Sequence, residues 1–435
     1  MSRASAQALV LLTTALCIAQ TPHAGAAEPG PTFTQDVLPI FQDHCQDCHR
    51  PNQIAPMSLL SYQESRPWAK SIRNAVSSGI MPPFFAEAPL GHFQDDNRLT
   101  DTEIETILRW VDDGAPRGDP KHAPPRREWN RDGWTRGDPD LVLEFPEYTI
   151  KSTKTDEHIL FFSDQLFRTH RWVEAFELKI NDYSLVHHAG VYAVDDKFFV
   201  TDDLVLDSED QELHRFGGDP AARLSLTMGQ DLLFVWLPGQ RVMPRTTKIG
   251  TGRRVVLQTH IPPMLEESLL HLSLGIWFEN GRLDTHTLNR AVVAPDLVIP
   301  PGAENHEVTR WHKFGQDVTV LGFDVHMHLR GRSAQIRFHY PEGAVETVLD
   351  VPQFSFDWQR PYFLTKPMHV PGGTRIEYTA AWDNSTKNPL NPDPSMEVRW
   401  GERTVDEMYA GKVIYSVKRK KAVRVVDGRV IRPPK

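Results

Sequence analysis

The segment Asp324-Val325-His326-Met327-His328-Leu329-Arg330-Gly331 follows a strand-like run, Val318 to Leu321, and ends at a glycine. Side chains two residues apart on a strand point to the same face. His326 and His328 are therefore predicted to present two imidazoles together, with Met327 turned the other way. Two neighbouring imidazoles suit a transition-metal ion. Because an H-x-H pattern is common by chance, its interpretation depends on the other histidines of the chain.

The length and composition of the chain indicate a multidomain protein that is rich in β-structure. A length of 435 residues predicts two or three domains, and the formal net charge of -9 is opposite to the basic surface of nucleic-acid-binding proteins. After about residue 140, runs rich in Val, Ile, Phe and Tyr alternate with Gly, Pro and Asp turns. Because no βαβ rhythm is present, this part predicts sandwiches rather than a parallel sheet.

The N-terminus has the pattern of a cleaved signal peptide, predicted at residues 1–26. Arg3 supplies the positive start, Ala8 to Ala19 the apolar core, and Ala24-Gly25-Ala26 the cleavage site. The apolar run is too short to span a bilayer, and no other stretch is predicted to span one. The pattern predicts a periplasmic or secreted protein. Since Cys17 leaves with this peptide, two cysteines remain and no disulfide framework is expected.

Those two cysteines lie in Cys45-Gln46-Asp47-Cys48-His49, which is the C-x-x-C-H pattern of covalent haem c attachment. Both thiols would bind the haem, and His49 would be the proximal iron ligand. A redox dithiol and half of a zinc site are the alternatives. A dithiol does not need His49, and no second cysteine pair completes a zinc site. The motif therefore predicts one covalent haem.

Residues 28–118 are predicted to form a small all-α domain that resembles class I cytochrome c. Helices are expected at 37–44, from 65 to the stop at Gly79, and from the capping box 100–103 to Gly114. Such a domain usually has a distal methionine, and Met81 and Met57 both qualify. Met81 is favoured because Pro82-Pro83 directs it into an extended loop, while the alternative for both is an ordinary core methionine.

The β-rich region contains a second group of histidines. His187-His188 begins a predicted strand, and His260 follows the apolar run Val255 to Leu257. Adjacent strand residues face opposite ways, so a bulge or twist is needed for His187 and His188 to bind the same metal. In the alternative, one of the two histidines is packed and the other is exposed. Three imidazoles without a carboxylate suit copper or zinc.

Met408 lies in Asp406-Glu407-Met408-Tyr409 and would ordinarily be a core residue. Combined with His326 and His328 it would form a softer site that favours Cu(I).

Taken in order, these elements resemble the copper type II, ascorbate-dependent monooxygenases, which include peptidylglycine α-hydroxylating and dopamine β-monooxygenases. The resemblance covers about residues 140–420 and implies two tandem all-β, jelly-roll-like sandwich domains, 137–290 and 291–420, each with one copper ion. It implies that one copper, which stores and relays an electron, is held by His187, His188 and His260. It implies that the catalytic copper, which binds dioxygen, is held by His326, His328 and Met408.

The haem motif in front of this region is similar to exported bacterial proteins in which a cytochrome c precedes the monooxygenase-like part. The disulfides of the animal enzymes are absent here. A Pro-rich linker is predicted at 119–136, and the tail 421–435 is predicted to contain a hairpin about Asp427-Gly428.

The resulting prediction is an exported monooxygenase that hydroxylates a C–H bond of a small organic substrate with dioxygen. Its two copper ions would receive electrons from the haem, and ascorbate or another cytochrome would be the external donor. The alternatives are a non-catalytic electron-transfer or copper-handling protein with the same ligands, and a structural sandwich whose histidines bind nothing.

Overall fold

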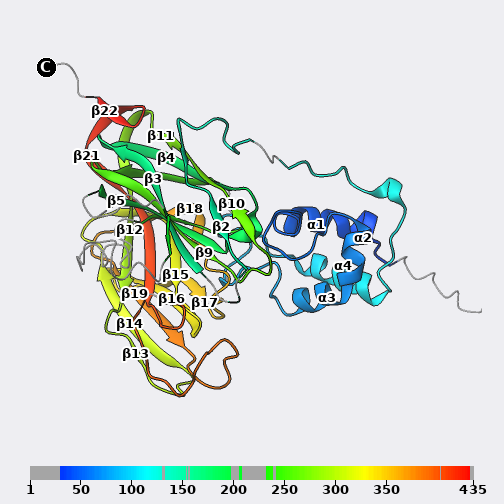
Figure 1. The fold of residues 1–435 in the computed structure, drawn as a ribbon. Coiled ribbons are helices and arrows are strands. Elements are labelled where there is room, and N and C mark those ends of the chain that lie inside the picture. The colour runs from blue at the N-terminus through cyan, green and yellow to red at the C-terminus, as the bar shows by residue number, and fades with distance from the viewer. Residues whose placement is uncertain are drawn as a thin grey trace, which may run out of the picture.

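The computed structural model describes residues 30–129, 133–152, 154, 157–196, 205–207, 232–238, 242–401 and 403–431; for 205–207 and 242–246 it describes the backbone alone. The predicted signal peptide lies outside the described residues. A small helical unit comes first and two β-sandwich units follow (Figure 1). None of the described helices has the length and apolar character needed to cross a membrane.

The helical unit packs around the aromatic side chains of Phe33, Phe41 and Trp110. The predicted capping box is confirmed, because Thr100 and Glu103 exchange hydrogen bonds at the start of the last helix. The predicted stop is confirmed at Gly79, which has a left-handed φ of 71°. After a helical turn Phe33–Val37, the helices are α1 (Leu38–His44), α2 (Tyr62–Ser65), α3 (Ala69–Ser77) and α4 (Asp101–Asp112).

The first β unit is a sandwich of two antiparallel sheets around a core that includes Phe161, Phe176 and Leu274. One sheet has the order β1 (Leu141–Glu144), β11 (Leu272–Phe278), β4 (Arg171–Ile180), β8 (Val242–Ile249). The other has the order β6 (Val205–Asp207), β3 (Glu157–Phe167), β9 (Arg253–Ile261), β5 (His188–Asp195), β7 (Leu232–Trp236). A ribbon joins β2 (Tyr148–Ile150) to β10 (Ser268–Leu270).

The second β unit repeats this plan. Its first sheet has the order β12 (Gly281–Val293), β21 (Ala410–Val426), β15 (Val318–His326), β18 (Tyr362–Val370), with β22 (Arg429–Ile431) beside β21. Its second has the order β14 (His306–Lys313), β19 (Arg375–Trp382), β16 (Gly331–His339), β17 (Val345–Val351). A short ribbon joins β13 (Val298–Ile299) to β20 (Val398–Arg399).

The start and the end of this unit can be compared with those predicted from the sequence. Because β12 pairs with β21 from Gly281 onward, the unit begins ahead of the predicted boundary at 290. The hairpin about Asp427-Gly428 is confirmed: β21 pairs with β22, and both turn residues have positive φ, 49° and 68°.

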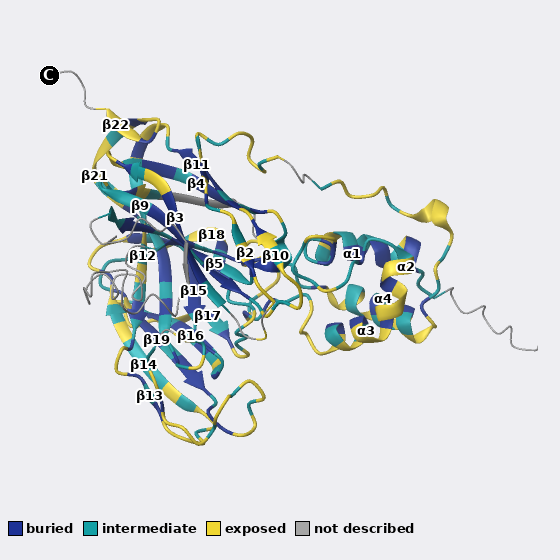
Figure 2. Cartoon of the chain, in the orientation of Figure 1, coloured by how far each residue is buried: buried dark blue, intermediate teal, exposed yellow. Residues whose placement is uncertain are grey.

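The helical unit is not a separate body. After α3 its chain runs along β18, where Phe93 forms a β-bridge with Leu364 and the Gln94 N–H donates to the Phe363 carbonyl at 2.7 Å. Phe84 and Phe93 are buried in the core of the second β unit. Buried residues are concentrated along the strands of the β units, while the helices keep exposed outer faces (Figure 2). The haem motif is therefore anchored to the β units by a segment of its own domain.

Candidate metal centres

Strand register brings three histidines together on the first β unit. His158 of β3 and His188 of β5 are both direct partners of His260 on the central strand β9. On β9, Val255 and Leu257 face the sandwich core, so the alternate position His260 faces the other side of the sheet. The sheet thus presents a row of imidazoles on the surface opposite its core.

His187 joins this row from outside the strand. It follows the turn Tyr183–Leu185 and precedes β5, and its backbone N–H donates to the His260 carbonyl at 2.8 Å. A bulge or twist of the strand was expected at this point, so that both neighbours could share a site. None is needed at this point, because His187 lies beyond the regular strand, where strict alternation does not apply.

The spacing of the ring nitrogens fits a metal ion. His187 Nδ1 lies 3.1 Å from His188 Nδ1 and 3.2 Å from His260 Nδ1. Two nitrogens bound to one tetrahedral ion at ordinary bond lengths are about 3.3 Å apart. The other nitrogen of His187, Nε2, is 3.8 Å from Asp357 Oδ1, which is longer than a hydrogen bond.

Burial keeps the His188 imidazole neutral. The pKa of His188 lies well below its ordinary value because the ring is buried, and the neighbouring His260 and His187 lower it further. A neutral imidazole has a free lone pair, so the ligand needs no deprotonation at neutral pH. This group, which we call the first histidine site, consists of His187, His188 and His260.

The second histidine site lies at the end of β15 and consists of His326 and His328. The two ring centroids are 5.2 Å apart, and Met327 is buried in the core on the other face, as the alternation predicted. His328 Nδ1 lies 3.2 Å from the Asp406 carbonyl, which leaves Nε2 for a metal. Burial lowers the pKa of His328 to about 4, and that of His326 well below its ordinary value.

Glu407 organises this site and was missed from the sequence. Its Oε2 accepts the backbone N–H of His328 at 2.9 Å and the indole N–H of Trp382 at 3.0 Å, while Oε1 accepts the backbone N–H of Arg330 at 2.6 Å. The side chain is fully buried, and burial raises its pKa to about 7. The sequence signal that could have identified Glu407 is its position next to Met408, a predicted copper ligand.

Met408 itself is half-buried. In the sequence it lies between Glu407 and Ala410, which both contact the H-x-H segment. Ala410 is the β21 partner of His326, and Glu407 binds the backbone of His328. The structure therefore brings the 407–410 backbone alongside the H-x-H segment.

Phe356, in the loop between β17 and β18, lies between the two sites. Its ring centroid is 6.3 Å from each of the rings of His187, His260 and His328. Sequence reasoning missed both Phe356 and His158, whose ring stacks on His260 at 4.7 Å. The two histidine sites therefore belong to facing sheets of different β units, with an aromatic side chain in contact with both.

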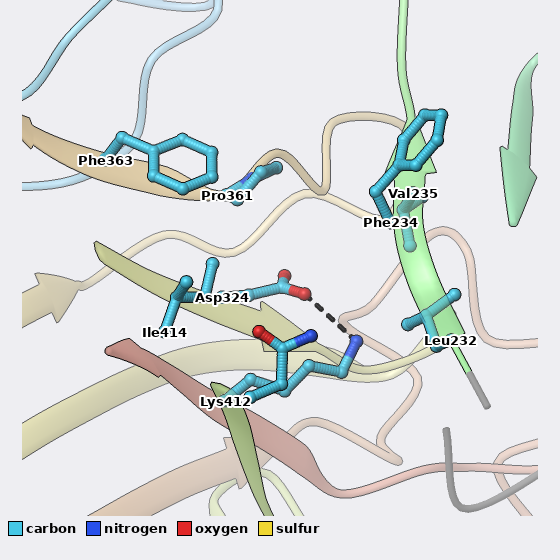
Figure 3. Close-up of a pocket in the computed structure, with 9 residues that line it drawn as sticks. Leu232, Phe234, Val235, Asp324, Pro361, Phe363, Lys412 and Ile414 are labelled. Carbon is cyan, nitrogen blue, oxygen red and sulfur yellow. Dashed lines mark hydrogen bonds and ion pairs between the residues drawn. The ribbon is translucent and has the colours of Figure 1, made fainter. Parts of the chain in front are cut away.

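A small cavity lies beside the second site, between β7 and the first sheet of the second unit (Figure 3). Asp324 and Lys412 form an ion pair of 3.0 Å in its wall, and Phe234 and Phe363 supply apolar surface. The volume of about 20 Å³ is room for a water-sized group. Asp324, two residues before His326, is therefore a buried ion-pair partner.

The haem motif forms a compact turn in which the backbone N–H of His49 donates to the Cys45 carbonyl at 2.9 Å. His49 Nδ1 lies 3.2 Å from the Met57 carbonyl, which leaves Nε2 for an iron ligand. Burial raises the pKa of Cys45 to about 12 and that of Cys48 to about 11. Redox dithiols have a lowered thiol pKa, so the environment is opposite to that of a C-x-x-C redox site. The residues fit a covalent haem.

Met81 follows α3 and is 40% exposed, outside the core of the helical unit. The haem-motif turn also touches the first β unit, because the Tyr183 N–H, four residues before His187, donates to the Asn52 carbonyl at 3.2 Å.

Comparisons with known proteins give no family. No family model matches the chain, and no curated protein matches it. Among solved structures, the infectious bursal disease virus Gx strain is 9% identical, with 65% of this chain and 73% of that chain covered and a TM-score of 0.20. The major capsid protein P2 of bacteriophage PM2 is 8% identical, with 64% and 97% covered and a TM-score of 0.24. Such low scores carry no argument about this protein.

Proposed function

We propose that this protein is an exported, copper- and haem-containing monooxygenase that hydroxylates a C–H bond of a small organic substrate with dioxygen. In this proposal the β units are jelly-roll-like domains of the copper type II, ascorbate-dependent kind, and the helical unit is a cytochrome c domain. The observation that supports it best is the convergence of five histidines from two β units on facing sheets. They are His187, His188 and His260 on one side and His326 and His328 on the other.

The two sites differ in their donor atoms. The first offers three nitrogens at ligand spacing, and the second offers two nitrogens with the thioether of Met408 in the adjoining segment. When bound, copper supplies one-electron redox chemistry and reactivity toward dioxygen, and haem supplies electron transfer. The polypeptide holds the imidazoles in place. Glu407 fixes the backbone that carries His328, and Phe356 fills the space between the sites.

At the haem, His49 is the proposed proximal ligand and Met81 the distal ligand. The carbonyl of Met57 contacts His49 Nδ1, the nitrogen that faces away from an iron bound at Nε2. Met57 therefore lies on the proximal side, which favours Met81 over Met57. A thioether ligand raises the haem potential and suits electron transfer.

The helical unit also contacts the first β unit near the first histidine site. Asn52, three residues after His49, accepts a hydrogen bond from the backbone N–H of Tyr183, in the turn that leads to His187. Electrons from ascorbate or another cytochrome would enter at the haem, in a periplasmic or secreted protein.

The test uses holoprotein reduced with ascorbate and then mixed with dioxygen, with haem absorbance and oxygen uptake followed together. Copper-loaded protein is expected to reoxidise its haem faster than copper-free protein, and a screen with labelled dioxygen is expected to find a hydroxylated product. M408A should lose this acceleration while remaining folded, whereas M396A, at an exposed methionine, should keep it.

Equal rates with and without copper, or an M408A variant that behaves as the wild type, would reject the oxygenase. Electron transfer between haem and copper without oxygen uptake would instead support the alternative, a non-catalytic electron-transfer protein. Failure to bind copper at neutral pH would reject both.

A further inference from the structure

His158 of β3 lies beside the first histidine site but is not one of its three members. Its ring is stacked on that of His260, with an interplanar angle of 4° and centroids 4.7 Å apart. The two residues are direct partners in the antiparallel register of β3 and β9, so both side chains stand on the same face of the sheet. One face of the buried His260 ring is therefore covered by the half-buried ring of His158.

The parallel stack decides which rings can share one ion. An ion bound to an imidazole nitrogen lies in the plane of that ring, about 2.0–2.1 Å from the nitrogen. Stacked rings stay about 3.5 Å apart, so an ion in the plane of His260 lies well outside the plane of His158. The rings of His187 and His188 are instead inclined to His260 by 82° and 67°, so their planes can cross at a common ion. His158 thus contacts a ligand of the site without being placed to act as one.

The stack also restrains the orientation of His260. The torsion that turns a histidine ring about its bond to Cβ has a broad energy profile, so neighbouring groups must fix the ring plane. Among the described ring contacts of His260, the one with His158 is the parallel contact, whereas Phe356 is tilted by 57° and lies 6.3 Å away. Turning the His260 ring would drive its edge into His158, and close packing resists this movement.

We propose that His158 is a positioning residue of the first histidine site; this rests on the copper part of the proposed function. By stacking on His260, it keeps Nδ1 of that ring 3.2 Å from His187 Nδ1, at the spacing that a shared ion requires. The role needs a flat ring and not a nitrogen ligand. A ring held in one plane presents the same nitrogen to Cu(I) and to Cu(II), so the site rearranges little when the ion gains or loses an electron.

The test compares H158F, which keeps a flat ring without nitrogen, with H158A, which removes the ring. Both are made in the full chain carrying H326A and H328A, which remove the second histidine site. H158A is expected to weaken Cu(II) binding about tenfold in a competition titration and to change the Cu(II) electron paramagnetic resonance spectrum. H158F should match its parent in both measurements, as should the control H271A, at an exposed histidine of the same β unit.

Equal losses of affinity in H158F and H158A would show that His158 binds copper through a nitrogen, and would overturn the inference. Urea titrations of the metal-free variants test a purely structural role: lower stability of H158A with an unchanged copper affinity and spectrum would also overturn it. If H158F does not fold, H158Y supplies a flat ring with a polar edge for the same comparison. If the wild type binds no copper, then the copper part of the proposed function fails first, which is a distinct result.

Discussion

Replacing Glu407 tests whether the second histidine site is held by one buried carboxylate. E407A removes the acceptor of three buried donors: the backbone N–H groups of His328 and Arg330 and the indole N–H of Trp382. Each unsatisfied buried donor costs about 1–3 kcal/mol, so the expected loss of unfolding free energy is at least about 3 kcal/mol. E407Q keeps one oxygen and leaves one backbone donor facing an amide nitrogen, so it should cost about 1–3 kcal/mol.

The measurement is a urea titration of metal-free protein followed by circular dichroism. Burial raises the pKa of Glu407 to about 7, so the titration belongs at pH 8, where the side chain is largely ionised. E342A, at an exposed turn residue, is the control and should change stability by less than about 0.5 kcal/mol. If E407A cost no more than this control, the carboxylate would not organise the site and the reasoning would be refuted.

Two further predictions concern the histidines. H260A should lower bound copper from two equivalents to one in elemental analysis, whereas H369A, at an exposed position on β18, should keep both; two equivalents retained by H260A would exclude it as a ligand. The folded pKa of His328, about 4, is below its ordinary value of 6.5, so metal-free protein should be most stable above pH 6.5. It should lose about 3 kcal/mol from this group alone as the pH falls toward 4, because the unfolded chain then binds a proton that the folded chain does not. Unfolding free energies that stay constant across this range would contradict the buried, neutral imidazole.

Local patterns predicted the parts of the molecule that depend on neighbours in sequence. Alternation along β15 placed Met327 in the core and the flanking histidines outside it, and the capping box located the start of α4. The overall class, a helical unit followed by β-sandwiches, followed from the same periodicities. Such features are set within a few residues of the chain, so the sequence alone is sufficient to predict them.

The residues that were missed depend on contacts between distant parts of the chain. His158 reaches His260 through strand register, and Phe356 reaches His187 and His328 through the path of a loop. Neither position carries a local pattern. The entry of Phe84 into the core of the second β unit is of the same kind, because only the folded arrangement brings it to β18.

The loop between β17 and β18 contacts the candidate metal sites of both β units. Phe356 contacts both histidine sites, and the same loop leads into β18, which pairs with the segment that carries Phe93. A rotation of one β unit away from the other would separate Phe356 from His187 while leaving it attached to the second unit. The distance between the two histidine sites therefore depends on the contacts that this loop makes with the first β unit. Substitutions in the loop should consequently alter electron transfer between centres while the ligands of each centre stay intact.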